Sequence, residues 1–489
     1  MSTVSSVGGS SGGSYTPQTL GISAATALTL LKKNPSLSVT ISDSTQNIVK
    51  NLDALQKVSS KITSLTTTDA NKKMTVTATQ YQNDGAILAK FGAGSGQTIG
   101  VTGMKASSTA SLASYVASVT VLDTTSNLST NLDRLQTLST SGILTEVQQA
   151  GAQGNLTVTA AQLVADAGVL SKFKNGAYTL AVTGATVSDA LGLGSNPALG
   201  TNAKVKSIAI VDNTTNIHDH LDELQRIGLK VKSIAQTDVA TTLNITGAQY
   251  TQDKLVLGKF ITADHLALQD AAVGQLNTMH ADHKVVSIAV ADTAANLSKN
   301  WALLQNLASS LTSVKVTNQT AAISITGDQL NTGATLLGKF EDTQSQTYKL
   351  AVTAVSASSA TTIAANQHVT TMDISDTGAN VAASMDDLQT VDAAGKLNSI
   401  TLGSTAATKA MSMDVSRLKG NQLNPTQAIL DKIKRGGYQL SITGASAADL
   451  TDLAANRRVS AITVADSSTN IKGALSDLAH LGGRLTAIE

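Results

Sequence analysis

The stretch VVSIAVADTAANL, residues 285–297, carries the pattern that decides the fold. Apolar residues alternate with small or polar ones up to Asp292, and this alternation predicts a strand. After Asp292 the apolar positions are Leu297, Trp301 and Leu304, which lie on one face of a helix because they are spaced i, i+4 and i+7. The segment is therefore predicted to be a strand followed by a helix of roughly four turns.

The same frame occurs six times along the chain without gaps. In each copy an aspartate is followed four residues later by an asparagine and then by an apolar residue. The copies lie about 80 to 90 residues apart, and self-similarity at a nearly fixed period indicates a repeat architecture. The six aspartates are Asp43, Asp123, Asp212, Asp292, Asp376 and Asp466.

Two further segments complete each repeat. The second is a strand that ends in Ser or Thr before a Gln, as in LTVTAAQL at 156–163, and its short helix ends in L-x-K-F, as at 170–173. The third begins Y-x-L-x-V-T-G, as at 178–184, and continues into an Ala- and Ser-rich helix. One more short alternating stretch, such as LTSVKV at 311–316, lies between the first and second segments.

Strands that alternate with helices in this way predict parallel strands joined by crossover helices. The predicted fold class is α/β, a repeat protein built as a continuous β/α solenoid of five full and two partial repeats, because the connections are short and no linker separates the repeats. A row of tandem βαββαβ domains is the alternative. The predicted divisions are a flexible Gly/Ser-rich N-terminal arm at 1–20, a partial repeat at 21–35, repeats 1 to 5 at 36–117, 118–204, 205–284, 285–368 and 369–458, and a partial repeat at 459–489.

The composition excludes several kinds of site. The chain has 489 residues, no cysteine and a formal net charge of +1, so it offers neither thiolate ligands nor a basic surface for nucleic acid. No dinucleotide fingerprint or P-loop occurs in a suitable context, and no paired carboxylates are evident. His218 with His220, and His280 with His283, are interpreted as solvated surface. We therefore predict no cofactor, no metal site and no catalytic residue, so that the protein is not an enzyme.

Aromatic residues make up only 2% of the chain, and all four phenylalanines occupy the L-x-K-F position. Most tyrosines also recur at fixed places in the repeat, and Trp301 replaces a core leucine. We therefore expect the aromatic side chains to be buried in the repeat core. Few are left to stack on sugars or bases, which disfavours a carbohydrate or single-strand nucleic-acid groove.

The repeated aspartate is interpreted as a structural cap of the helix that follows it. Asp is a preferred N-cap residue, since its carboxylate accepts a hydrogen bond from an otherwise unpaired amide of the first turn. The asparagine four residues later is expected to pair with loop backbone. A calcium site is the alternative, but it needs about six to eight oxygen ligands, and the frame supplies one carboxylate and one amide.

Both ends of the sequence support predictions about export and assembly. The N-terminal residues lack the basic start and apolar core of a cleavable secretory signal peptide, and no apolar run of about 18 residues predicts a transmembrane helix. The chain is expected to begin inside a third segment and to close at LTAIE, where a strand is starting. Open strand ends invite pairing with another chain. The predicted polymer contacts are Tyr15, Pro17, Leu20, Leu485 and Ile488.

The chain resembles the repeat regions of bacterial cell-surface proteins, namely surface-layer proteins and large adhesins exported by type I secretion. The resemblance rests on a cysteine-free chain rich in Thr, Ser, Ala and Asn, whose repeats carry V-x-D-[ST]-x-x-N-[IL] and a later L-T-[VI]-T. It implies an extracellular or cell-surface protein that self-associates or adheres, exported without a cleavable N-terminal signal peptide.

The predicted function follows from the repeat and from this resemblance. We expect a non-enzymatic structural subunit of an extracellular self-assembling filament or surface lattice, joined head to tail through its open repeat ends. Its partner would be itself, with a cell-surface glycan as a further candidate, and neither nucleic-acid binding nor membrane insertion is expected. The alternative is a monomeric adhesin or binding module that presents one solenoid face to a protein or glycan.

Overall fold

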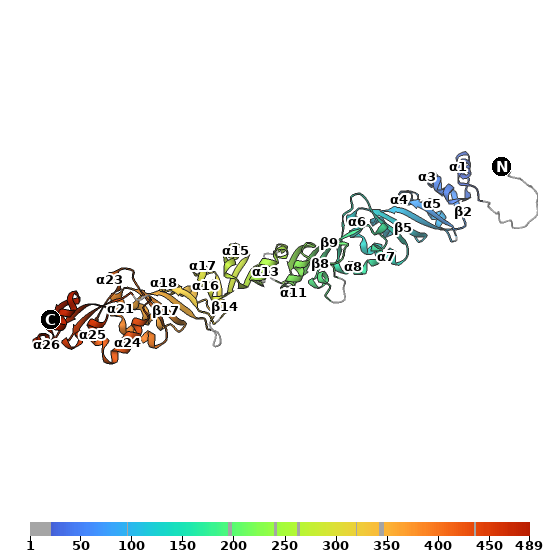
Figure 1. Cartoon of the computed structure of the whole chain (residues 1–489). Helices are drawn as coiled ribbons and strands as arrows, with labels where there is room; N and C mark the ends of the chain where they lie inside the picture. The colour runs from blue at the N-terminus through green and yellow to red at the C-terminus, as the bar shows by residue number, and fades with distance from the viewer. Residues whose placement is uncertain are drawn as a thin grey trace, which may run out of the picture. The chain divides into compact units, whose positions relative to one another are not determined.

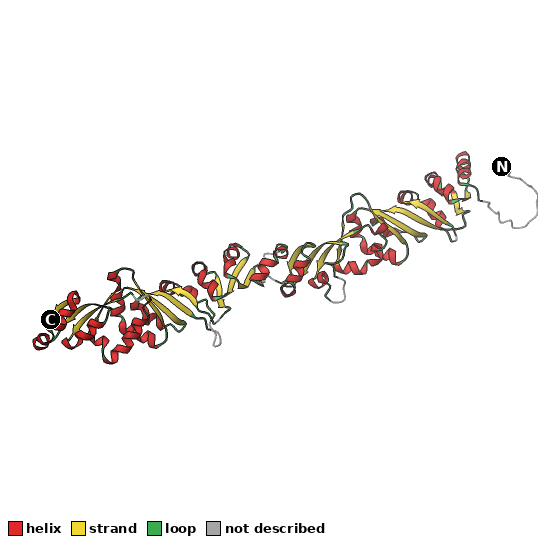
Figure 2. Ribbon diagram, viewed as in Figure 1, coloured by secondary structure: helices red, strands yellow, loops and turns green. Residues whose placement is uncertain are grey.

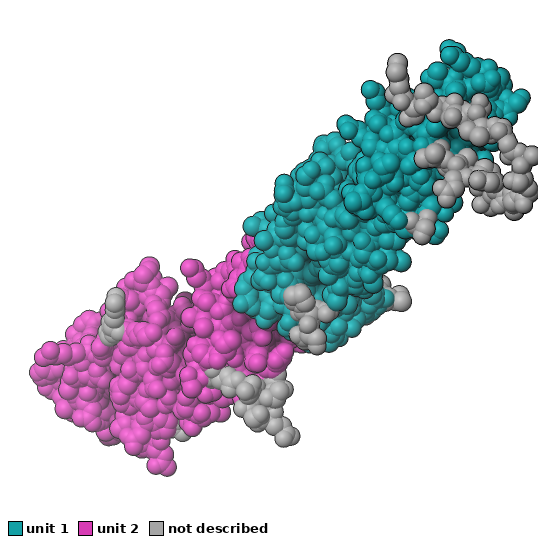
Figure 3. Space-filling view, turned by 90° about the vertical axis from the view of Figure 1, so that its right-hand side faces the viewer, with its two compact units in different colours: residues 1–239, 255–262 teal, residues 240–254, 263–489 magenta. Residues whose placement is uncertain are grey.

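Figures 1 and 2 show a chain of successive strand–helix units in a computed structural model. The structure describes residues 21–489, apart from residues 95, 194–197, 239–241, 262–264, 319, 342–346 and 435–436. The chain divides into two compact units (Figure 3). Unit 1 consists of Met1–Val239 and Leu255–Thr262, and unit 2 of Ala240–Lys254 and Ala263–Glu489.

Within the described residues, unit 1 contains one parallel pair of strands and two parallel sheets of four strands. In each sheet the strands lie side by side in chain order. The pair is β1 (Val39–Asp43) and β2 (Ile62–Thr67); the sheets are β3 (Lys73–Thr77), β4 (Thr98–Met104), β5 (Val116–Asp123) and β6 (Leu144–Gln149), then β7 (Asn155–Thr159), β8 (Thr179–Ala185), β9 (Val205–Asp212) and β10 (Val231–Gln236).

The described part of unit 2 repeats the same arrangement in three sheets. All strand pairs are parallel, so the predicted α/β repeat fold with parallel strands is confirmed. The strands are β11 (Leu243–Thr246), β12 (Leu266–Ala271), β13 (Val285–Asp292) and β14 (Leu311–Val316); β15 (Ile323–Thr326), β16 (Leu350–Val355), β17 (Val369–Asp376) and β18 (Leu397–Leu402); and β19 (Ala410–Asp414), β20 (Gln439–Ala445), β21 (Val459–Val464) and β22 (Leu485–Ile488).

Each sheet begins with the strand of a second segment and then adds the third segment, the first segment and the extra alternating stretch. The sheet β3–β6 therefore begins in the predicted repeat 36–117 and ends in the predicted repeat 118–204. Strand pairing stops between β6 and β7, where the next sheet starts.

Helices connect successive strands, because parallel neighbours need a crossover. A pair of short helices follows each first-segment strand: α2 (Thr45–Lys50) and α3 (Leu52–Lys57), α6 (Thr125–Thr130) and α7 (Leu132–Thr140), α11 (Thr214–Asp219) and α12 (Leu221–Arg226), α16 (Ala294–Lys299) and α17 (Trp301–Leu307), α21 (Gly378–Ala383) and α22 (Met385–Ala393), and α26 (Ser468–Gly473) and α27 (Leu475–Leu481).

The second-segment strands lead into α4 (Ala78–Asn83) and α5 (Gly85–Gly92), α8 (Ala160–Ala165) and α9 (Ala167–Leu170), α13 (Gly247–Gln252) and α14 (Lys254–Leu257), α18 (Gly327–Thr332) and α19 (Ala334–Leu337), and α24 (Gly420–Asp431). The remaining α-helices are α1 (Ala24–Lys33), α10 (Val187–Leu191), α15 (Leu276–Ala281), α20 (Ala360–Ala364), α23 (Ala406–Lys409) and α25 (Leu450–Ala455).

The prediction of one four-turn helix after each first-segment strand was wrong. The helix is broken at residues such as Asn51, whose backbone has φ −106° and ψ 9°. The Asn51 side-chain amide donates to the carbonyl oxygen of Asn47, and Asn131 and Asn300 make the same contact four residues back. The break does not require an asparagine, because it also occurs at His220, Ser384 and Ala474 in the other three copies.

The Gln of the second segment caps the helix that follows it, a role that was not predicted from the sequence. Thr159 Oγ1 accepts from the backbone amide of Gln162 at 3.1 Å, and Gln162 Oε1 accepts from the backbone amide of Thr159 at 3.0 Å. This reciprocal capping box satisfies two unpaired amides at the start of helix α8. Helices α4, α13 and α18 begin with the same Thr-x-x-Gln box.

Candidate functional site

The six repeated aspartates lie at the ends of strands or, in the case of Asp466, two residues beyond, and each bonds to the connections on both sides of its strand. Asp123 Oδ1 accepts from the backbone amide of Thr124 at 2.8 Å and from the side-chain amide of Asn127 at 2.9 Å, while its Oδ2 accepts from the backbone amide of Ala106 at 2.9 Å. The same three contacts recur at Asp43, Asp212, Asp292, Asp376 and Asp466.

The predicted N-cap position was wrong by one residue. The N-cap of the following helix is the residue after each aspartate, namely Ser44, Thr124, Asn213, Thr293, Thr377 and Ser467. The carboxylate instead bonds to the start of the preceding connection; Asp212 Oδ2, for example, accepts from the first amide of helix α10 at 2.8 Å. The repeated asparagine donates to this carboxylate and not to loop backbone as predicted.

These contacts identify the aspartates as structural. Burial alone would raise the pKa of Asp123, but the hydrogen bonds from Asn127, Ala106 and Thr124 outweigh burial and lower it. At Asp466 the amide of Ala447 is the main cause of a lowered pKa. Within the described residues, no group of three or more His, Cys, Asp or Glu side chains is placed to hold a metal ion.

The L-x-K-F motif closes the outer edge of a sheet. In the turn 170–173, the backbone oxygen of Lys172 accepts from the amide of Val147 on strand β6 at 2.9 Å, and Phe173 forms a parallel bridge with Val147. We call this four-residue segment the closing turn. It recurs at 257–260, 337–340 and 430–433, where the lysine oxygens accept from Ile234 at 2.8 Å, Val314 at 2.7 Å and Ile400 at 2.8 Å.

The phenylalanines of these turns are buried, as is Trp301, so the predicted core position of these side chains is confirmed. The L-x-K-F pattern by itself does not indicate that the turn covers a sheet edge. At strand β2 the Gln97 side chain, and not a turn, covers the outer edge. Gln97 Nε2 donates to the Leu65 oxygen at 3.0 Å, and Gln97 Oε1 accepts from the Thr67 amide at 2.6 Å.

Strand β22 has the same place in its sheet as β6 but a different environment. Val464 pairs with Ile488 as Val121 pairs with Val147. Ile488 is nevertheless 48% exposed, whereas Val147 is fully buried. Among the residues that the structure describes, none donates to or accepts from the backbone of Ile488 on the outer edge of β22.

The helix pair beside β22 is exposed as well. Leu475 is 60% exposed, although the matching residues Leu52, Leu132, Leu221, Trp301 and Met385 are all buried. Ile471 is half-buried, whereas its counterpart Leu128 is fully buried. We call Ile471, Leu475 and Ile488 the β22 face, and it is the candidate functional site.

The predicted polymer contacts are therefore described only in part. Leu485 lies in β22 and pairs with Ile462, and Ile488 belongs to the β22 face. Tyr15, Pro17 and Leu20 lie outside the described residues.

Carboxylates that lie in pairs, which were not predicted from the sequence, occur at equivalent positions of the repeat. Burial first, and then the hydrogen bond and charge of Asp53, raise the pKa of Asp84 to about 6. Asp166 beside Asp133 has its pKa raised to about 6 for the same reasons. In each pair one carboxyl group therefore keeps its proton to a higher pH than a free aspartic acid does, and Asp84 and Asp166 are both buried. The sequence signal was present, since each pair recurs with similar spacing.

In the described part of the chain, no helix is both long and apolar enough to cross a membrane. Comparison of the chain with models of known protein families finds no match, and comparison with curated proteins also finds none. The architecture therefore defines the class of protein, a mixed α/β repeat protein with parallel four-stranded sheets.

Proposed function

We propose that the chain is a non-enzymatic structural subunit that assembles with copies of itself into an extracellular filament or surface lattice. The β22 face carries this proposal, because its residues are half-buried or exposed, whereas the residues at the same positions of the other repeats are buried. An apolar face beside an unpaired strand edge favours association with another chain.

The other sheets indicate what would cover such an edge. Each supplies a backbone oxygen and a large apolar side chain from a closing turn, as Lys172 and Phe173 do for β6. The closing turns at 170–173, 257–260, 337–340 and 430–433 are engaged within their own chain. A second copy is the proposed occupant, through its N-terminal segment containing Tyr15, Pro17 and Leu20. A contact of this head-to-tail kind that does not close on itself produces a filament.

The proposal includes a continuous β/α solenoid in preference to tandem independent domains. It is supported by the closing turn at 170–173, which covers the edge of β6 and then leads directly into β8 of the next sheet. One short segment therefore serves two sheets, which is the nearest-neighbour coupling expected of a stacked repeat. The extracellular location rests on the resemblance to surface proteins, and antibody labelling of intact cells against lysed cells would test it.

Negative-stain electron microscopy of purified protein over a range of concentrations tests the assembly. The wild type should form polymers, and the double variant Leu475→Glu/Ile488→Glu should remain monomeric, because two buried charges would have to be desolvated at the contact. Leu229→Glu is the matched control, since Leu229 is 90% exposed and lies outside the β22 face.

Removal of residues 1–20 should also abolish the polymers. Unchanged polymers in the double variant would contradict the role of the β22 face. Monomers of the wild type at all concentrations would favour the monomeric binding module instead.

A further inference from the structure

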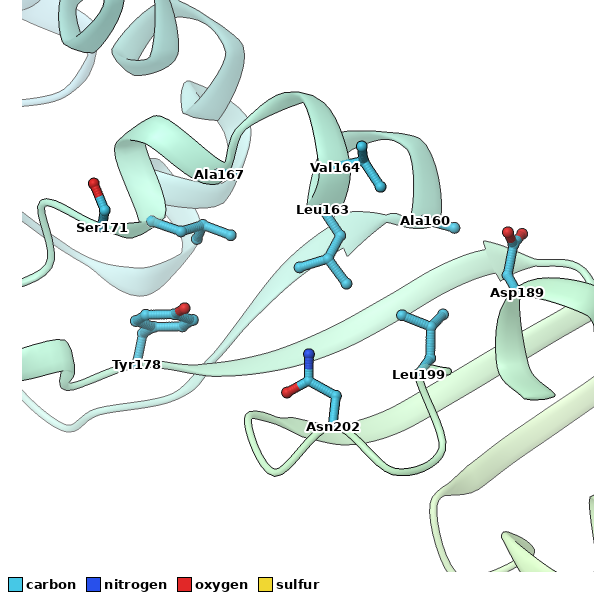
Figure 4. A pocket seen from close by; sticks show the side chains of 10 residues that line it. Ala160, Leu163, Val164, Ala167, Ser171, Tyr178, Asp189, Leu199 and Asn202 are labelled. Carbon is cyan, nitrogen blue, oxygen red and sulfur yellow. The ribbon is translucent and has the colours of Figure 1, made fainter. Parts of the chain in front are cut away.

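A cavity of about 440 Å³ lies in unit 1 between helices α8 and α9 on one side and Leu199 and Asn202, which precede β9, on the other (Figure 4). Its wall is mainly apolar, with Leu163, Leu170, Leu199 and the ring of Tyr178 around it. Asn202 adds a polar group on the side opposite Leu163, and Figure 4 shows its side-chain nitrogen pointing into the cavity. An apolar pocket with one placed polar group is the usual form of a small-molecule site.

The repeats themselves show what fits in such a place. Tyr81 and Tyr250 occupy the position of Leu163 in two other copies of the second segment. Their hydroxyl groups reach the connection that precedes the first-segment strand: Tyr81 Oη accepts from the amide of Ala113 at 2.9 Å, and Tyr250 Oη donates to Asp282 Oδ2 at 2.9 Å. In those copies a phenol ring therefore spans the distance from helix to connection.

Asn202 stands at the position of Ala113 and Asp282. In all three connections the amide three residues later bonds back to this residue's carbonyl oxygen, at 3.1 Å in the case of Asn202. The cavity thus lies between the two positions that a tyrosine joins elsewhere, and Leu163 is too short to cross it.

The polar group of the cavity is suited to a hydroxyl. Asn202 Oδ1 accepts from the backbone amide of Lys204 at 2.9 Å, so Nδ2 is the atom with hydrogens to donate into the cavity. Asp189, at the rim, already accepts from the backbone amide and hydroxyl of Thr186 at 3.0 Å and 2.9 Å. Its carboxylate serves the capping box of helix α10.

We propose that this cavity binds a small para-substituted phenol. The ring lies among Leu163, Tyr178 and Leu199, and the hydroxyl oxygen accepts a hydrogen bond from Asn202 Nδ2. The ligand reproduces the tyrosine side chain that Tyr81 and Tyr250 supply from within the chain.

Isothermal titration of the full chain with p-cresol tests the proposal, with toluene as the probe that lacks the hydroxyl. The wild type should bind p-cresol saturably at one site and bind toluene more weakly. Leu163→Tyr should weaken p-cresol binding at least about tenfold, because the new side chain fills the cavity. Asn202→Ala should weaken p-cresol binding about 3- to 10-fold and leave toluene binding unchanged, since it removes one hydrogen bond.

Leu330→Tyr is the matched control, because Leu330 occupies the same position in another repeat. It should leave p-cresol binding unchanged, and thermal melting of each variant should show that the chain is still folded. Comparison with N-acetyltyrosinamide distinguishes a free phenol from a tyrosyl side chain as the source of the same chemistry. No saturable binding by the wild type, or binding that a folded Leu163→Tyr variant retains, would overturn the proposal.

Discussion

The outer edges of β6 and β22 occupy equivalent places in their sheets, but one is covered and the other is exposed. The amide of Val147 bonds to Lys172 and its side chain is buried, whereas Ile488, in the same register, is 48% exposed. Both residues are β-branched and apolar, so the strand's own sequence does not distinguish them. The closing turn makes the difference: it covers the edge of β6, and none of the described residues forms such a turn on β22.

The largest expected effect comes from removing the cover of β6. Phe173→Ala should destabilise the fold around β6 by about 3–5 kcal/mol, because a buried phenylalanine is lost and leaves a cavity. Ile488→Ala should change the monomer by less than about 0.5 kcal/mol, since its side chain is half in solvent. Urea unfolding, with hydrogen exchange of β6 as the local probe, measures both, and equal effects would show that the two edges do not differ.

The repeated aspartate allows a second comparison, between a copy inside the array and the copy nearest the C-terminus. Asp123→Ala should cost about 2–3 kcal/mol, because three donors lose their acceptor at a site that is 1% exposed. Asp466→Ala removes the same contacts where water can replace them, and it should destabilise the fold less than Asp123→Ala does. Thermal unfolding of the two variants under identical conditions compares them. A larger loss in Asp466→Ala would contradict the account.

The acid pair at the start of helix α9 makes the stability of unit 1 depend on pH. Because the pKa of Asp166 is raised from 3.8 to about 6, its contribution to stability is fully present below about pH 3.8 and is lost as the pH rises through about 6. Asp166→Asn should therefore stabilise unit 1 by about 1–2 kcal/mol at pH 8 and have little effect at pH 4. Unfolding at several pH values checks this, and Asp84→Asn provides an independent copy of the test.

Much of the fold could be predicted from the sequence, because alternation and helical spacing are local and six copies reinforce one another. The parallel strands and the buried phenylalanines followed from these patterns. The N-cap was misplaced because Asp123 and Thr124 are both good capping residues, and the choice depends on the amide of Ala106, which comes from an earlier connection. The break at Asn51 was not predicted, because the apolar spacing of i, i+4 and i+7 continues across it.

The candidate site was harder to predict, since it depends on pairings between distant parts of the chain. Ile488 was predicted to be a polymer contact, because it lies where a strand begins. Leu475 occupies a repeat position that was predicted to be in the core in all six copies. The exposure of Leu475 depends on what packs against its helix, and the sequence of its own segment does not reveal this. The pair of Asp133 and Asp166 likewise forms only when two helices from different segments meet.

Hydrogen exchange of the residues of β22 as a function of protein concentration tests the central claim most directly. If a second copy covers this edge, the amide of Ile488 should exchange rapidly in dilute solution and become protected on assembly, approaching the protection of Val147 in β6. Exchange at Ile488 that stays rapid at every concentration, including in any polymer that forms, would contradict the claim that β22 is an assembly edge.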